Sequence, residues 1–130
     1  MTAFLVGVVL AFAVGVFATL VGLDRDRAFY PTVMIVIASL YALFAVMGGS
    51  THALAEELIF TVLFVAASIA GFKRSLWVIV AALAAHGCFD FVHARVIANP
   101  GVPVWWPSFC AAYDITAAGY LAWRIKASRT

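Results

Sequence analysis

Apolar residues occupy five long stretches of the chain, at about 3–23, 31–49, 53–72, 76–97 and 107–123. Each stretch is close to the roughly 20 residues that an α-helix needs to cross the hydrocarbon of a bilayer. Strands are a poor alternative, because an isolated apolar strand leaves its backbone N–H and C=O groups unpaired in lipid. The pattern therefore predicts an all-α integral membrane bundle of five transmembrane helices.

Short polar segments separate these stretches, at residues 24–27, 48–51, 73–75 and 99–106. The second segment, Gly-Gly-Ser-Thr, is typical of a tight turn. The last segment is the longest and leads into Pro107, a residue suited to the first turn of a helix. No internal repeat divides the chain, so we expect residues 1–130 to form one helical bundle.

The composition supports a membrane location. Hydrophobic residues make up 66% of the chain and charged residues 11%, whereas average soluble domains are about half apolar and a quarter charged. A soluble fold of 130 residues has too much surface for its volume to hide so many apolar side chains. The net charge of +2 is too small to indicate nucleic-acid binding, so lipids are the expected surroundings.

The positive charges lie mainly on one side of the predicted bundle. Five crossings place seven cationic side chains on the side of the C-terminus, and these are Arg25, Arg27, Lys73, Arg74, Arg124, Lys126 and Arg129. The opposite side holds Arg95 alone. Because cytoplasmic loops are enriched in Lys and Arg, the N-terminus is predicted outside and the C-terminus in the cytoplasm, and a bacterial-type inner membrane fits this bias.

A stripe of small residues follows the first predicted helix: Gly7, Ala11, Gly15, Ala18 and Gly22. Small residues at such spacing let another helix approach closely. The partner helix is either in the same chain or in a second molecule, so a homodimer or a larger membrane complex is one expectation.

Four of the six acidic residues lie inside predicted spans: Glu56, Glu57, Asp90 and Asp114. Ionisable groups are costly in the bilayer and are functional candidates there. At about 1.5 Å of rise per residue, all four fall roughly 8–10 Å below the predicted outer face. Three helices should therefore bring carboxylates to one level.

Histidines accompany these acids. His86, Asp90 and His93 are spaced i, i+4 and i+7, so they share one face of their helix. Cys110 shares a face with Asp114 and is interpreted as a packing residue. Mixed imidazole and carboxylate ligands suit Zn²⁺, Fe²⁺ or Mn²⁺. The predicted metal ligands are His86, Asp90, His93 and Glu56, and the predicted catalytic carboxylates are Asp114 and Glu57.

A simpler interpretation of the same residues is structural. Asp90 and Asp114 can pair with Arg95 and the histidines to hold helices together. Glu56 and Glu57 can favour the first turns of their helix through its dipole.

Histidines and an aspartate on one membrane helix, His86, Asp90 and His93, facing acids on others, resemble the site of intramembrane metal-dependent hydrolases of the alkaline ceramidase type. The resemblance covers these few residues, and those proteins have seven spans where this sequence has five. It is a similarity of site chemistry, and it implies hydrolysis at a metal ion.

Three functions follow from these features. The first is a metal-dependent hydrolase that acts on a lipid or another apolar substrate. The second is a carrier or binding protein for a metal ion or a proton, in which the same acids bind without catalysis. The third is an accessory subunit of a larger membrane complex, which the small-residue stripe suggests.

Overall fold

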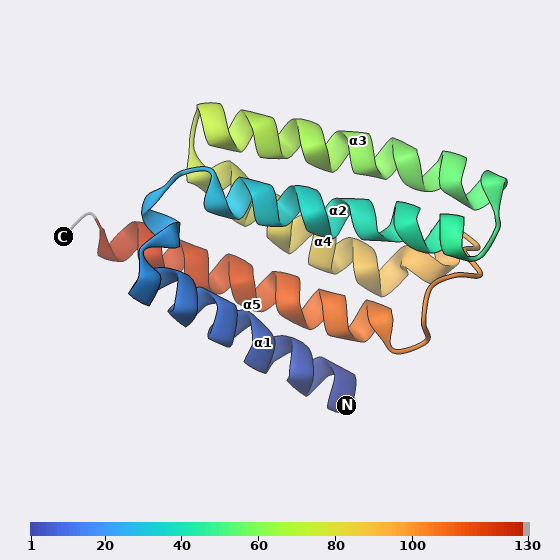
Figure 1. Ribbon diagram of the computed structural model, residues 1–130, viewed down its shortest axis with the longest axis horizontal. Coiled ribbons are helices and arrows are strands. Elements are labelled where there is room, and N and C mark those ends of the chain that lie inside the picture. Colours follow the sequence, from blue (N-terminus) through green and yellow to red (C-terminus); the bar gives the residue numbers. More distant parts are fainter. Residues whose placement is uncertain (129–130) are drawn as a thin grey trace.

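The computed structural model describes residues 1–128, which form five α-helices and one short 3-10 turn. The helices lie side by side along one axis (Figure 1). They are α1 (Thr2–Val21), α2 (Phe29–Met47), α3 (Thr51–Lys73), α4 (Leu76–Val96) and α5 (Trp106–Ala127), with the turn η1 (Leu23–Arg25) after α1. The predicted all-α class is confirmed. Arg129, one of the predicted cytoplasmic cations, lies outside the described residues.

Four helices, α1 to α4, are long and apolar enough to cross a membrane. α5 has 22 residues, but Asp114, Arg124 and Lys126 interrupt its apolar sequence. The chain is therefore a helical protein of integral membrane character. The fifth crossing and the orientation of the bundle stay predictions.

The helix ends follow from local sequence. Gly22 ends α1 with a left-handed backbone (φ 95°), a conformation that costs glycine little. Ser50 Oγ accepts a hydrogen bond from the Ala53 backbone N–H at the start of α3, and Ser75 Oγ accepts one from Trp77 at the start of α4. Such caps satisfy backbone donors that a helix leaves free at its first turn.

α5 lies between α1 and α4, while α2 packs on α3 and α4. The small-residue stripe of α1 is the surface that meets α5, because Gly7, Ala11, Gly15 and Ala18 are buried. A Cβ atom on Gly7 would meet the Phe109 carbonyl, and one on Gly15 would meet the Tyr120 ring. The stripe thus packs within the chain, and association with a second copy or a larger complex stays a prediction.

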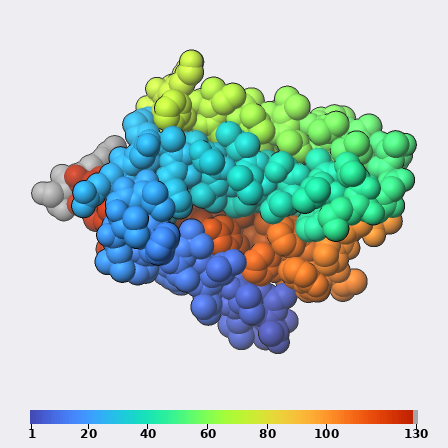
Figure 2. Space-filling model, in the orientation of Figure 1, coloured from blue at the N-terminus to red at the C-terminus, as the bar shows by residue number. Residues whose placement is uncertain are grey.

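A lateral hollow lies between the connection that follows α1, the first half of α2 and Tyr113 of α5. It has a volume of about 670 Å³, and its walls include Leu23, Phe29, Val33, Ile37 and Tyr113. Figure 2 shows atoms of α5, in orange, between α1 in blue and α2 in cyan. The side of the bundle is therefore open toward Tyr113, the neighbour of Asp114 in the sequence.

Candidate metal centre

Two pairs of potential ligands face each other across the contact between α4 and α5. His86 and Asp90 are one helical turn apart on α4, and Cys110 and Asp114 are one turn apart on α5. An i, i+4 spacing puts both members of each pair on one side of their helix. Gly87 permits the close approach, since a Cβ atom there would lie 3.3 Å from the Ala111 carbonyl and 2.7 Å from the Ile115 side chain.

Two carboxylates converge on the imidazole of His86, and the Cys110 thiol lies against one of them. The imidazole Nδ1 shares a hydrogen bond of 2.7 Å with Asp114 Oδ2 and lies 3.6 Å from Asp90 Oδ2. The Cys110 thiol lies 3.7 Å from Asp114 Oδ2. Tyr41, on α2, donates a hydrogen bond of 2.6 Å to the other oxygen of Asp90. Three helices therefore fix the carboxylates that surround one imidazole.

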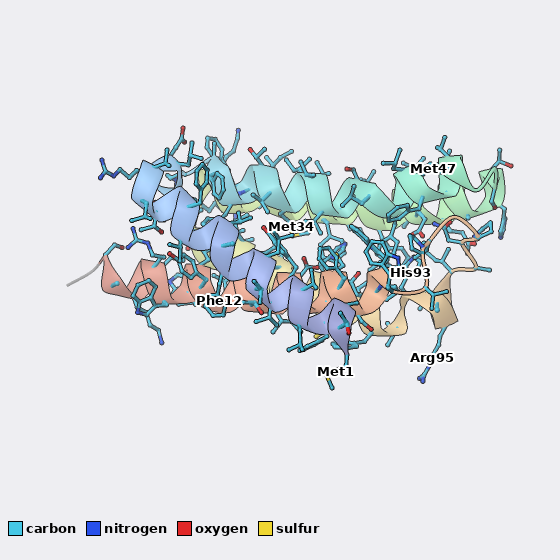
Figure 3. The ribbon with its side chains drawn as sticks, turned by 60° about the horizontal axis from the view of Figure 1, so that its bottom comes forward. Met1, Phe12, Met34, Met47, His93 and Arg95 are labelled. Carbon is cyan, nitrogen blue, oxygen red and sulfur yellow. The ribbon has the colours of Figure 1, made fainter. Side chains whose placement is uncertain are left out.

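These groups are shielded from solvent, and among the described residues they have no lysine or arginine as an ion-pair partner. His86, Asp90, Cys110 and Asp114 are each at most 3% exposed. Within residues 1–128, no lysine or arginine forms an ion pair with Asp90 or Asp114. Arg95, the expected partner, is exposed and points away from the bundle (Figure 3). Asp90 Oδ2 makes no hydrogen bond, although a buried polar atom without one is costly.

The donor set is suited to a metal ion. One ligand atom from each of His86, Asp90, Cys110 and Asp114 can be chosen so that all four lie within 4.8 Å of one another. Zinc bonds of about 2.0–2.3 Å to nitrogen, oxygen and sulfur place tetrahedral ligands about 3.3–3.8 Å apart. The buried group could therefore hold a metal ion.

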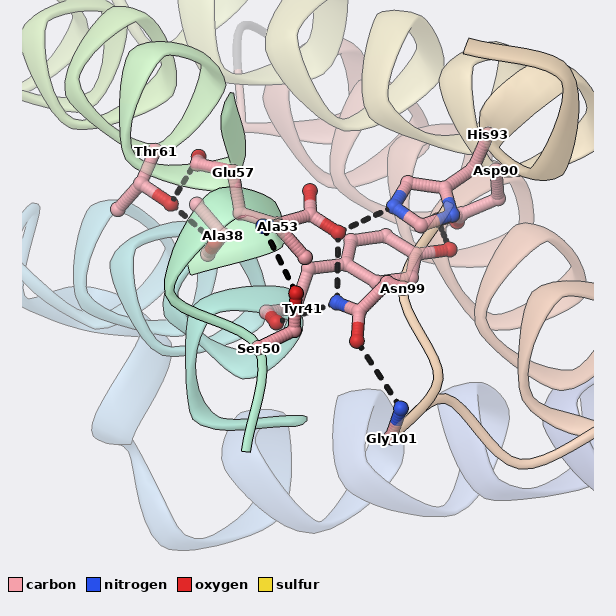
Figure 4. A network of polar contacts seen from close by, with 10 residues as sticks. All are labelled: Ala38, Tyr41, Ser50, Ala53, Glu57, Thr61, Asp90, His93, Asn99 and Gly101. Atoms are coloured by element: carbon pink, nitrogen blue, oxygen red, sulfur yellow. Dashed lines mark hydrogen bonds and ion pairs between the residues drawn. The ribbon is translucent and has the colours of Figure 1, made fainter. Parts of the chain in front are cut away.

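A second histidine–acid pair lies nearer the α4–α5 loop (Figure 4). His93 Nε2 and Glu57 Oε2 are 2.5 Å apart, which ties α4 to α3. Asn99, in the loop, donates hydrogen bonds to the same Glu57 oxygen at 2.8 Å and to the Tyr41 carbonyl at 3.0 Å. The ring of Tyr41 stacks on His93, with centroids 3.8 Å apart and planes 7° apart. Tyr41 therefore contacts both histidine–acid groups.

The predicted site residues are distributed between these groups. His86, Asp90 and Asp114 lie together, whereas His93 and Glu57 form the second pair. Glu56 joins neither, because its carboxylate pairs with exposed His52 at 3.1 Å and is itself 39% exposed. Consecutive helical residues point about 100° apart, and α3 is turned so that Glu57 is buried and Glu56 is not.

Three contributors were missed or undervalued in the sequence. Cys110 was interpreted as packing, although its i, i+4 spacing to Asp114 was the signal for a shared site. Tyr41 lies about 12 Å from the predicted end of its span, eight residues at 1.5 Å each, which is close to the depth of the acids. Asn99 gave no signal, since loop sequence does not show which way an amide points.

Comparisons of this chain with protein-family models, with curated proteins and with solved structures found no match. Function must therefore be argued from the site itself.

Proposed function

We propose that the protein is an integral membrane protein that binds a divalent transition-metal ion at His86, Asp90, Cys110 and Asp114. One observation carries the proposal: two carboxylates and a thiol meet one imidazole in a buried interior where no lysine or arginine of residues 1–128 pairs with the carboxylates. Removing a carboxylate from water costs several kcal/mol or more unless it is paired. A divalent cation offsets that cost for both aspartates together.

The ligand chemistry favours zinc among the three metals expected from the sequence. A thiolate selects softer ions such as Zn²⁺, whereas Mn²⁺ prefers oxygen ligands, and imidazole suits both zinc and iron. Four protein ligands would close a tetrahedral site, which is the arrangement of zinc sites that bind without catalysis. A binding or carrier role is therefore our first proposal.

The test is to purify the protein in mild detergent without chelators and to measure bound metals by elemental mass spectrometry. Wild type should carry close to one equivalent of metal, and Asp90→Ala should lose it. Glu56→Gln is the matched control, because its carboxylate is partly exposed and lies outside the centre. Metal absent from wild type, or retained by Asp90→Ala, would contradict the proposal.

We propose further that all five helices cross the bilayer, with the N-terminus outside and the C-terminus in the cytoplasm of a bacterial-type cell. Support for the fifth crossing comes from α5, which packs between α1 and α4 and runs alongside both (Figure 1). Labelling with a membrane-impermeant thiol reagent in intact cells should modify Thr51→Cys and spare Lys126→Cys. The reverse pattern would invert the orientation.

A second candidate is a metal-dependent hydrolase with an apolar substrate. In it, His86, Asp90 and Cys110 would hold the metal, and water would take the fourth position and be activated there. Asp114 would then act as the general base instead of as a ligand. The lateral hollow beside α2 favours it, because this apolar space reaches Tyr113 from the side of the bundle. A screen of long-chain esters and amides with zinc-loaded protein tests it. Hydrolysis that Asp114→Asn abolishes while it retains its zinc would support catalysis, and metal binding without turnover would leave the binding role alone.

A further inference from the structure

The second histidine–acid pair borders a hollow at the loop end of the bundle. This hollow has a volume of about 360 Å³, and its walls include Ala94, His93, Asn99 and Pro107. Glu57 lies directly behind two of these residues, since its carboxylate bonds to both His93 and Asn99. A carboxylate and an imidazole thus meet beside this hollow, and the amide group of Asn99 holds the carboxylate in place.

Glu57 has a free coordination position. The residue is 1% exposed, and both bonds of its carboxylate go to Oε2. The other oxygen, Oε1, is buried and makes no hydrogen bond. Among the described residues no lysine or arginine pairs with this carboxylate. A cation that reaches the hollow therefore finds a negative group with an unoccupied lone pair behind His93 and Asn99.

Tyr41 connects this pair to the centre. Its ring covers the face of His93, and its hydroxyl holds Asp90. His93 and His86 are seven residues apart on α4, which corresponds to about 10 Å along the helix axis. A chain of contacts therefore runs from the hollow through Glu57 and His93, past Tyr41, to Asp90, and Tyr41 occupies the space between the two acid groups.

We infer that Glu57, His93 and Asn99 form a loading site, which captures a divalent transition-metal ion from the loop-end hollow and passes it to the centre as Tyr41 moves. The inference rests on the proposed metal-binding function. It assigns the ion a direction of approach, from the α4–α5 loop, and it assigns Glu57 a kinetic role. Glu57 sets how fast the ion arrives, while His86, Asp90, Cys110 and Asp114 set how tightly it is held.

The experiment is stopped-flow loading of metal-free full-length protein in detergent with Co²⁺, whose thiolate charge-transfer absorption reports contact with Cys110. Glu57→Gln should slow loading by about tenfold, because charged clefts raise on-rates by roughly 10- to 1,000-fold. The final absorption and the bound cobalt should equal those of wild type. Glu56→Gln is the matched control, a neighbouring glutamate outside the loading site, and should load within about twofold of wild type.

Three outcomes would overturn the inference. Loading of Glu57→Gln at the wild-type rate would remove Glu57 from the ion's approach. A lower final occupancy in Glu57→Gln would make Glu57 part of the resting site. Wild type that binds no cobalt would defeat the proposed function itself, and the loading site with it. In the first two outcomes wild type still binds cobalt, so failure of the loading site is distinguishable from failure of the proposed metal binding.

A second pair of variants keeps the inference testable if Glu57→Gln fails to fold. Ala94 and Ala85 are both exposed alanines on α4. Ala94 borders the loop-end hollow, whereas Ala85 borders a different hollow between α3 and α4. Ala94→Trp should narrow the approach and slow cobalt loading, and Ala85→Trp should not. Equal loading by the two variants would contradict approach through the loop-end hollow.

Discussion

Two buried acidic regions at different depths of the bundle are compensated in different ways. Near the C-terminal end of α5, Asp24 Oδ2 accepts hydrogen bonds from Arg124 Nε at 3.2 Å and from Thr19 Oγ1 at 2.7 Å. In the centre, Asp114 and Asp90 meet a histidine, a thiol and the Tyr41 hydroxyl. The first carboxylate has a permanently charged partner, whereas the two central ones have none within residues 1–128.

This difference separates a structural ion pair from a candidate binding site. A guanidinium stays protonated in proteins, so Arg124 neutralises the Asp24 carboxylate without a cation from solution. An imidazole can give up its proton and become a ligand. An oxygen without a hydrogen bond in residues 1–128 does not distinguish the regions, because Asp24 Oδ1 and Asp90 Oδ2 both lack one. The central region is therefore the one that should respond to a metal ion, and the Asp24 region should not.

The largest expected effect is on metal affinity. Asp114→Asn replaces a charged ligand with a neutral amide of nearly the same shape. Loss of a residue that only hydrogen-bonds to a ligand lowers metal affinity by about 10- to 100-fold. Loss of the ligand itself should therefore lower the affinity by at least about 100-fold. Arg124→Met is the counterpart in the other region and should leave affinity unchanged. Competition with a chromogenic chelator measures both. Equal affinities in all three proteins would remove the distinction between the regions.

The second-largest expected effect is a loss of stability when the metal is removed from the wild-type protein. A ligand at about 100 times its dissociation constant stabilises the folded state by about 2.7 kcal/mol. A strong chelator should therefore lower the thermal midpoint of wild type and leave that of Asp114→Asn unchanged. Differential scanning fluorimetry in detergent follows both. A chelator shift of the same size in Asp114→Asn would place the ion elsewhere.

Replacement of Arg124, the structural cation, should destabilise the protein by as much as metal removal or less, and it should not change metal binding. Arg124→Met leaves Asp24, whose side chain is 4% exposed, without its charged partner. Loss of a hydrogen bond to a charged group costs about 1.5–3 kcal/mol when buried, and partial exposure of Arg124 reduces this figure. Thermal unfolding should show a lower midpoint with an undiminished response to chelator. A diminished response would mean that the two regions are coupled.

The smallest effect is expected at the surface. Glu56 pairs with His52, whose side chain is 87% exposed. Exposed ion pairs contribute about 0–1 kcal/mol, so Glu56→Gln should shift the unfolding free energy by less than about 0.5 kcal/mol and keep the metal. A loss of metal from Glu56→Gln would show that the centre extends farther than the four residues.

The helices could be predicted from the sequence because the signal is strong and local. Long apolar runs ended by Gly, Ser and charged residues predict helices whose bounds agree with the structure to within two residues, apart from the end of α5 at Ala127. The predicted end at residue 123 was early because Arg124 and Lys126 mark the end of the apolar span. A helix can continue beyond the membrane surface into water, so the end of the span is not the end of the helix.

The site could be predicted only in part, because helix rotation about its own axis is decided by packing. The spacing of His86 and Asp90 fixes their shared face within α4, and the depth of Asp114 puts it at their level. Nothing local decides whether Glu56 or Glu57 faces inward. That choice follows from the contact of α3 with α4, where His93 meets Glu57. The spacing of apolar residues along one helix does not predict such contacts with another helix.

The central claim is that a metal ion is held jointly by α4 and α5, and X-ray absorption spectroscopy of zinc-loaded protein tests it most directly. One sulfur at about 2.3 Å should accompany nitrogen and oxygen ligands at about 2.0–2.2 Å. Cys110→Ser should remove the sulfur signal, and Cys88→Ser should keep it, because Cys88 is exposed and Cys110 is buried. A shell without sulfur in wild type, or a sulfur signal that depends on Cys88, would contradict the claim.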